Sequence, residues 1–193
     1  MSLMGTEDIY AQFPRLETPH LLLRDLQPQD APAIFRIFSD PQVTRYYDLD
    51  TFTSLEQARE LIDRFRQRFT NRIGLRWAIA HRAEPDSLLG TCGFNAWFQS
   101  SHRAIIGYDL IRSHWRRGIT SEALTAILHF GFDQMALNRV EALIFGENVP
   151  SQHLLEKLRF QREGLLREYE HLQGRFVDMA IYSLLHHEFA QGR

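Results

Sequence analysis

The sequence predicts a single α/β (α+β) domain built on a mixed, mostly antiparallel sheet, and two patterns together with the chain length carry this prediction. Apolar residues alternate around 75–79, and the runs 88–96 and 103–111 are rich in strand-forming residues, which indicates an antiparallel meander. A helix-length segment, 119–135, then leads into a short β-prone stretch, 140–145, as in a strand–helix–strand unit with parallel strands. The 193 residues match the size of one domain.

Before the meander, the sequence predicts one strand and two helices. Residues 20–26 have the pattern of a strand, and Asp30 is expected to cap a helix that ends near Pro41. Ser54 followed by Gln57 is a capping-box pattern. Apolar residues then recur at helical spacing: Leu55, Ala58, Leu61, Ile62, Phe65 and Phe69.

After the strand–helix–strand unit, the sequence predicts a helix and a hairpin. The helix covers 148–158 and begins at an Asn-Val-Pro sequence, which is typical of a helix start. Two strands, 164–172 and 176–185, follow and are joined at Gln173-Gly174. Within the meander, a turn is expected at 84–86.

Composition narrows the function classes. A formal net charge of −2 and a pI near 6.5 supply no field for a nucleic-acid backbone, so we expect no nucleic-acid partner. No apolar stretch approaches the roughly 20 residues that span a bilayer, and residues 1–12 show no secretory signal, which predicts no membrane partner and a cytoplasmic location. Residues 1–12 are expected to be flexible or to hold an expression remnant. The lone Cys92 and the spacing of His186-His187 predict no metal site.

The stretch most informative about chemistry, residues 107–124, runs from a strand end through a basic loop into a helix start. Unpaired N–H groups in a first helical turn, together with the positive end of the helix dipole, bind anions such as a pyrophosphate. Gly118 allows close approach of the backbone, and Arg116 and Arg117 add positive charge. The pattern is neither a Walker loop nor a Gly-x-Gly-x-x-Gly fingerprint. In the alternative interpretation, Gly118 only bends the loop and the arginines are solvated.

These residues carry a resemblance to a known family. Trp115-Arg-Arg-Gly-Ile-Thr-Ser-Glu-Ala123 resembles the acyl-CoA pyrophosphate loop of the GNAT N-acetyltransferase superfamily. The match runs from about Leu16 to His187, with the motifs in the expected order. Further segments are similar to the ribosomal-protein-alanine (Rim-type) N-terminal acetyltransferases: Leu16-Glu-Thr-Pro-His-Leu-Leu-Leu-Arg24, Ser39-Asp-Pro41, Gly107-Tyr108, Asn148-x-x-Ser151 and Leu155-Glu-Lys-Leu-Arg-Phe160.

The resemblance implies that two central parallel strands splay apart, with helices flanking the sheet, and that acetyl-CoA binds in the gap as acyl donor. Its pantetheine arm would pair with the backbone near Leu110 and Ile111. Ser151 would protonate the departing thiolate. The other cofactor-binding residues that the resemblance implies are Arg116, Arg117, Gly118, Ile119, Thr120, Ser121 and Asn148. Without the resemblance, helix capping is the favoured role of Asn148 and Ser151.

The resemblance also bears on the general base, which must take a proton before an amine attacks a thioester. Many relatives carry a glutamate just before the Ile-Gly-Tyr segment, where this chain has Ile105. Relatives of the ribosomal-protein subgroup carry one four residues before the glycine of the last turn, which here is Glu170. Glu170 is therefore the predicted base, and Glu168 shares its strand parity. A solvated strand edge and a water-relayed deprotonation are the alternatives.

The predicted function is acetyl transfer from acetyl-CoA to a primary amine by direct attack in a ternary complex. The expected acceptor is the N-terminal α-amine of a ribosomal or similar protein, with a small amine, antibiotic or polyamine as the alternative. A non-catalytic acyl-CoA-binding module is a second class, favoured by Ile105 and by Thr120 where many members have Gly or Ala. We expect residues 1–193 to form one acetyltransferase domain, and pairing through an edge strand would be an ordinary route to a homodimer.

Two groups of side chains allow more than one interpretation. Five aromatic residues are expected to wall either a peptide cleft or a closed small-molecule pocket: Tyr46, Tyr47, Phe94, Trp97 and Phe98. Five arginines crowd the second helix and its exit: Arg64, Arg66, Arg68, Arg72 and Arg76. A solvated helix face is the favoured interpretation of the arginines, and a surface for an acidic partner or the ribosome is the alternative.

Overall fold

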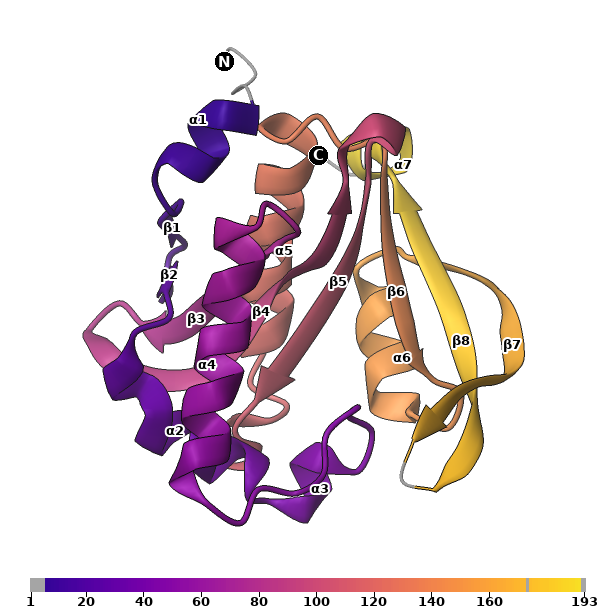
Figure 1. Ribbon diagram of the computed structural model, residues 1–193. Helices are drawn as coiled ribbons and strands as arrows, with labels where there is room; N and C mark the ends of the chain where they lie inside the picture. The colour runs from indigo at the N-terminus through magenta and orange to yellow at the C-terminus, as the bar shows by residue number, and fades with distance from the viewer. Residues whose placement is uncertain (1–5, 173, 192–193) are drawn as a thin grey trace.

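The computed structural model describes residues 6–172 and 174–191. Its centre is an eight-stranded sheet with the strand order β1-β2-β3-β4-β5-β6-β8-β7. Every neighbouring pair is antiparallel except β5 and β6, which confirms the predicted mixed, mostly antiparallel sheet. The strands (Figure 1) are β1 Leu16–Glu17, β2 Leu21–Asp25, β3 Leu75–His81, β4 Glu84–Phe98, β5 Arg103–Leu110, β6 Arg139–Phe145, β7 Gln161–Leu172 and β8 Arg175–Leu185.

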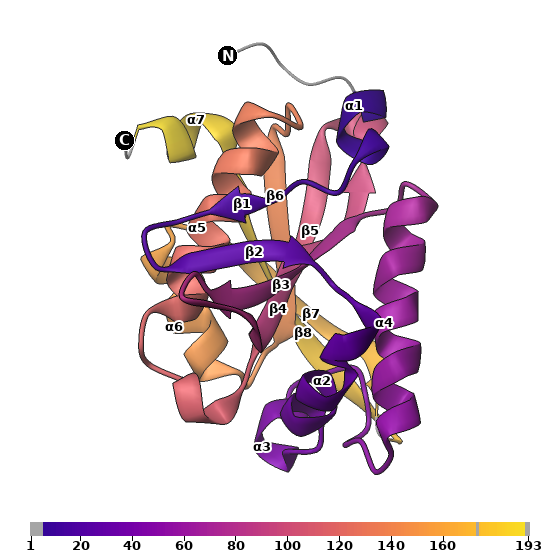
Figure 2. The same ribbon diagram turned by 90° about the vertical axis from the view of Figure 1, so that its left-hand side faces the viewer.

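Helices cover both faces of this sheet (Figures 1 and 2). They are α1 Thr6–Ala11, α2 Ala31–Phe38, α3 Pro41–Thr44, α4 Leu55–Thr70, α5 Ile119–Asp133, α6 Val149–Lys157 and α7 His186–Ala190. Buried residues of α2 and α4 pack on one face, and those of α5 and α6 pack on the other. None of the helices within the described residues combines the length and apolar character needed to cross a bilayer.

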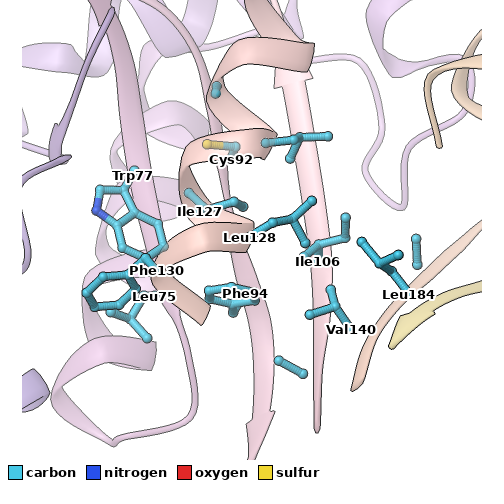
Figure 3. Packing of buried hydrophobic residues seen from close by; sticks show 14 of the residues in the cluster. Leu75, Trp77, Cys92, Phe94, Ile106, Ile127, Leu128, Phe130, Val140 and Leu184 are labelled. Atoms are coloured by element: carbon cyan, nitrogen blue, oxygen red, sulfur yellow. The ribbon is translucent and has the colours of Figure 1, made fainter. Parts of the chain in front are cut away.

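The larger core lies between the sheet and α5 (Figure 3). Alternation along β3 directs Leu75, Trp77 and Ile79 to this side, and each is at most 1% exposed. The Trp77 ring meets the rings of Phe94 and Phe130 edge to face, with centroids 6.1 and 5.7 Å apart. The period-two pattern of the meander and the helical pattern of α5 therefore meet in one core, as the sequence predicts.

The opposite face of the sheet is covered by α2 and α4. The predicted capping pattern is present at the start of α4, where the Gln57 side-chain oxygen accepts the Ser54 N–H at 3.0 Å. Asp30 behaves differently from the prediction, because its carboxylate accepts the Arg24 guanidinium at 2.7 and 2.8 Å and makes no side-chain cap on α2. The same carboxylate accepts the Gln27 N–H at 2.8 Å, so it is engaged by the arginine and by the chain before α2 rather than by the first turn of α2.

Two local expectations differ from the structure. Glu84, Pro85 and Asp86 belong to β4 rather than to a turn, and the register shifts between Ala80 and His81 of the facing strand. Proline is tolerated in such an irregular stretch because regular ladder hydrogen bonds are already interrupted there. In the hairpin between β7 and β8, Gly174 adopts a φ of 76°, while Gln173 lies outside the described residues.

The N-terminal segment contributes to the fold. Residues 1–5 lie outside the described residues, whereas α1 packs on the domain within the segment 1–12, which was expected to be flexible or an expression remnant. Ile9 is 1% exposed. The Tyr10 ring stacks on Trp97 and contacts Phe69, with centroid distances of 5.7 and 5.2 Å. These aromatic contacts explain why α1 is held against the end of the meander.

Candidate active site

The two parallel strands at the centre of the sheet separate along their length. β5 and β6 pair only where 103–105 of β5 face 139–141 of β6. Beyond these residues β5 continues to Leu110 and β6 to Phe145, and the two ribbons diverge in Figure 1. The splayed parallel pair that the resemblance implies is therefore present.

Backbone alternation decides which residues of β5 face this gap. The Ile111 N–H donates to the Leu89 carbonyl of β4 at 2.8 Å. Because successive residues of a strand direct their backbone groups to opposite sides, Leu110 and Tyr108 face β6 instead. The Leu110 carbonyl also accepts the Trp115 indole N–H at 2.8 Å. Of the two residues predicted to pair with a pantetheine arm, Leu110 lies at the edge of the gap and Ile111 is bonded to β4.

The loop after β5 ends at the first turn of α5. Gly118, the residue before α5, adopts a φ of 80°, in the left-handed region that favours glycine. A Cβ built at Gly118 would meet no atom within 4 Å, so the space beside it is open. Arg116 and Arg117 are exposed next to it. The N–H groups of 119–121 begin the helix and have no acceptor one turn earlier, so the loop has the elements of an anion site.

Glu122 in the first turn of α5 holds the N-terminal part of the chain. Its Oε1 accepts the Thr18 hydroxyl at 2.5 Å and the His20 N–H at 3.0 Å, and its Oε2 lies 3.1 Å from His20 Nδ1. Partial burial acts to raise the pKa of Glu122, but these hydrogen bonds outweigh it and lower the pKa. The contact joins residues 104 positions apart, so local pattern did not reveal it.

Three polar side chains meet at the start of α6, those of Asn148, Ser151 and Tyr108. The Asn148 side-chain oxygen accepts the Ser151 N–H at 3.2 Å, so Asn148 caps the helix. The Ser151 hydroxyl, on a residue 7% exposed, is hydrogen-bonded to the Tyr108 hydroxyl of β5. Burial raises the pKa of Tyr108 to about 12 despite this hydrogen bond. Ser151 was predicted from the sequence, whereas Tyr108 appeared there only as part of a Gly-Tyr motif with no role assigned to it.

Glu170 lies in β7 directly opposite Val177 of β8, and it is exposed. Directly opposed residues of an antiparallel pair share a face of the sheet. Val177 packs with Phe145 at the end of β6, and the Phe145 ring is 5.9 Å from that of Tyr46. Glu170 therefore lies on the face of the sheet that the segment after α3 approaches, whereas Ser151 packs from the α6 face.

Glu168 does not follow the strand parity that the sequence suggests. Its φ is 50°, and the register of β7 shifts between Leu166 and Glu170. Its backbone N–H donates to the Asp178 carboxylate at 2.8 Å instead of continuing a regular ladder. Such an irregularity breaks the two-residue alternation, so the orientation of Glu168 does not follow from that of Glu170.

The five aromatic residues predicted to wall an acceptor site lie in three different places. Phe94 and Trp97 are 1% and 8% exposed and belong to the core. Phe98 lies at the surface, with the Arg103 guanidinium 3.8 Å from its ring centroid. Tyr46 and Tyr47 lie on the segment after α3, which approaches the face of the sheet where Glu170 lies.

Arg76 is buried beneath that segment rather than exposed on a helix face. Its guanidinium contacts Asp109 at 2.7 Å, Thr91 at 2.7 Å, Asn95 at 3.0 Å and the Tyr47 hydroxyl at 3.1 Å. Arg76 is 3% exposed. The carboxylate and three neutral acceptors satisfy the buried charge, as a buried ion pair requires. The sequence interpretation of Arg76 as part of a solvated face is wrong, because strand alternation in β3 directs it inward.

Two further expectations concern metal and thiol chemistry. No group of three His, Cys, Asp or Glu residues able to hold a metal ion occurs within the described part of the chain. Cys92 is fully buried, and burial raises the pKa of its thiol to about 12. A thiol with so high a pKa is a poor nucleophile, in line with its interpretation as a packed core residue.

Comparison with known proteins gives a consistent assignment. Residues 20–161 match the family described as "Acetyltransferase (GNAT) domain". The uncharacterized N-acetyltransferase YoaA of Bacillus subtilis (strain 168) is 43% identical over 173 residues, covering 90% of this chain and 97% of YoaA. The ribosomal protein uS5-alanine N-acetyltransferase of Escherichia coli (strain K12) is 26% identical over 113 residues, covering 57% and 58% of the two chains.

The fold has solved counterparts as well. The structure of RimL, a ribosomal-protein alpha-N acetyltransferase in complex with coenzyme A, superimposes with a TM-score of 0.79 at 21% identity, covering 89% of this chain and 98% of RimL. This likeness concerns the fold. With the family match over residues 20–161, the chain belongs to the GNAT acetyltransferase family.

Proposed function

We propose that this chain moves an acetyl group from acetyl-CoA to a primary amine, and that the acceptor is the N-terminal α-amine of a protein, a ribosomal protein in the first instance. The observation that carries the proposal is the Tyr108–Ser151 hydrogen bond beside the gap between β5 and β6. The ribosomal acceptors named for the E. coli relative and for RimL support this substrate class. Residues 1–193 would act as a single acetyltransferase domain.

The residues at the gap fit acetyl-CoA, which supplies an acetyl thioester and carries phosphates. The N–H groups of 119–121 and the side chains of Arg116 and Arg117 would hold the pyrophosphate, with Gly118 leaving room for it. The gap-facing backbone of Leu110 would pair with the pantetheine amides, in preference to Ile111. The side-chain N–H groups of Asn148 are left to donate, since its oxygen caps α6. The cofactor residues expected from the resemblance are thus retained except Ile111.

The leaving sulfur requires an acid. The reaction forms a C–N bond and breaks a C–S bond, so one proton must leave the amine and one must reach the sulfur. Ser151 would supply the proton to the sulfur. A phenol is a stronger acid than an aliphatic hydroxyl, so in the hydrogen bond between them Tyr108 would donate to Ser151 Oγ and leave the Ser151 proton free for the sulfur. Tyr108 then returns a proton to Ser151 and is itself reprotonated from solvent.

Glu170 is the proposed base for the acceptor amine. It lies on the face of the sheet that Tyr46 approaches, opposite the face from which α6 supplies Ser151, so base and acid would act from two sides of the gap. Because Glu170 is exposed, a water molecule between the amine and the carboxylate is an equally direct route for the proton. An α-amine with a pKa near 8 needs little assistance of this kind.

Thiol release from acetyl-CoA by the purified protein, measured with a panel of N-terminal peptides and small amines, tests the proposal. Release with one peptide class, lost in Ser151→Ala, would support an N-terminal acetyltransferase. Release only with small amines would replace the protein acceptor by a metabolite or drug. A protein whose melting temperature rises with acetyl-CoA but that releases thiol with no amine would be a binding module, and the proposed reaction would be rejected.

A further inference from the structure

Arg68 of α4 is a half-buried cation with no counter-ion among the residues that the structure describes. Its guanidinium lies 5.8 Å from the centroid of the Phe65 ring. Within residues 6–172 and 174–191 it has neither a hydrogen bond nor an ion pair, and Asp48, the carboxylate that acts on it, stays beyond ion-pair distance. Partial burial lowers the pKa of Arg68, and the nearby Arg76 and Arg64 lower it further. Burial and the two neighbouring arginines therefore disfavour the charged form of Arg68.

The neighbouring Arg76 and its hydrogen-bond partners do not provide a counter-ion for Arg68. Its guanidinium lies 4.9 Å from the centroid of the same Phe65 ring and is engaged by Asp109, Thr91, Asn95 and Tyr47. Because Asp109 is engaged by Arg76, it does not serve as the counter-ion of Arg68. Arg76 is therefore buried and paired with a carboxylate, whereas Arg68 is partly exposed.

Arg68 lies on the side of the gap where the acceptor amine is proposed to bind. Arg76 lies over β5, since a Cβ built at Gly107 would stand 2.9 Å from its Nη1. Tyr47 links Arg76 to the segment after α3 and also acts electrostatically on Arg68. The adjacent Tyr46 reaches Phe145 at the end of β6. This segment thus spans from Arg68 and Arg76 on one side of the gap to β6 on the other.

We propose that Arg68 binds a carboxylate of the acceptor, so that amines carrying a nearby negative charge are the preferred substrates. This inference rests on the proposed function and specifies its substrate class. A guanidinium binds a carboxylate through two parallel hydrogen bonds, and partial burial strengthens such a contact relative to one in water. The carboxylate has two sources, an acidic side chain close to a peptide N-terminus or the carboxyl group of a small amino acid.

Matched acceptor pairs test the inference. Thiol release is measured with peptides that differ only in Asp or Asn at the second position, and with γ-aminobutyrate against its amide. We expect kcat/KM to favour the carboxylate member of one pair by about tenfold or more, as for a charge-assisted hydrogen bond. Arg68→Gln should abolish this preference. Arg66→Gln, an exposed position roughly 200° around the same helix, is the control and should retain it.

Binding of the acceptor can also be measured without turnover. The shift in melting temperature caused by each member of the peptide pair and of the γ-aminobutyrate pair is recorded in the presence of CoA, for the unchanged chain and both variants. A larger shift with the carboxylate member of one pair, lost only in Arg68→Gln, supports the site even if no thiol is released. Equal shifts within both pairs, or a preference that survives in Arg68→Gln, would overturn it.

Discussion

The hydroxyl groups of Tyr108 and Ser151 are joined by a hydrogen bond that links β5 to the first turn of α6. The two residues lie 43 positions apart in the chain. They meet because β5 and β6 separate after 103–105, which leaves room for the Tyr108 side chain to reach the start of α6. A pair of hydroxyls in this position suits proton delivery into the gap.

Removing the Tyr108 hydroxyl tests that role. Tyr108→Phe should lower kcat about tenfold, and Ser151→Ala about a hundredfold, the lower end of the range for a positioned acid. The rise in melting temperature with acetyl-CoA should be preserved in both variants, because neither hydroxyl is proposed to bind the pyrophosphate. An unchanged kcat in Tyr108→Phe would mean that Ser151 acts without its partner.

Replacing Glu170 tests the proposed base. Glu170→Gln should lower the rate at neutral pH, where the acceptor amine is mostly protonated, and the deficit should shrink above about pH 8, where the free amine predominates. A pH–rate profile measures both effects. Glu168→Gln is the matched control, because Glu168 lies on the irregular part of the same strand. Equal profiles for Glu170→Gln and the unchanged chain would favour a water relay without this carboxylate.

The backbone of Gly118 provides a third prediction. Gly118→Ala should lower the free energy of unfolding by about 1 kcal/mol, because alanine is strained at a φ of 80°. Gly174→Ala carries the same strain at a φ of 76° in the distant β7–β8 hairpin, and neither added Cβ would meet an atom within 4 Å. Only Gly118→Ala should weaken the thermal stabilisation by acetyl-CoA. If both variants lost the same part of the stabilisation by acetyl-CoA, the loss would follow from the lower stability of the fold and not from the loop at Gly118.

The sheet beyond the closed end of the gap should be sensitive to acid. Arg139 donates to both carboxylate oxygens of Glu163 at 2.7 and 2.6 Å, and Ser183 donates at 2.6 Å, so the pKa of Glu163 falls to about 2. A carboxylate with a depressed pKa stabilises the fold above its ordinary value of 4.5, and this contribution disappears as the pH falls from there toward 2.

Glu163→Gln should therefore lower the melting temperature near neutral pH, and its difference from the unchanged chain should vanish in strong acid. Thermal unfolding across the pH range measures this difference. Glu60→Gln, an exposed position on α4, serves as the control and should show a smaller difference. A difference that stays constant with pH would contradict the role assigned to the Arg139 contact.

Much of the fold could be predicted from the sequence, because strand alternation and helix capping depend on residues close together in the chain. The alternation of Trp77 and Ile79 identified β3, and Ser54 with Gln57 identified the start of α4. The short elements α1, β1, α3 and α7 were not predicted, since segments of two to six residues are too short for a periodic pattern. Their positions depend on what they pack against, as Tyr10 does on Trp97.

By itself, the sequence determined the order of the main strands and helices, the parallel strand–helix–strand unit and the loop that places Gly118 before α5, because each depends on residues close together in the chain. Only the tertiary structure decided that Tyr108 meets Ser151 and that Glu122 accepts the Thr18 hydroxyl. It also decided that Arg76 is buried in an ion pair, whereas Arg68 has none within the described part of the chain. These relations join residues far apart in sequence, and they follow from strand register and burial, which no local period encodes.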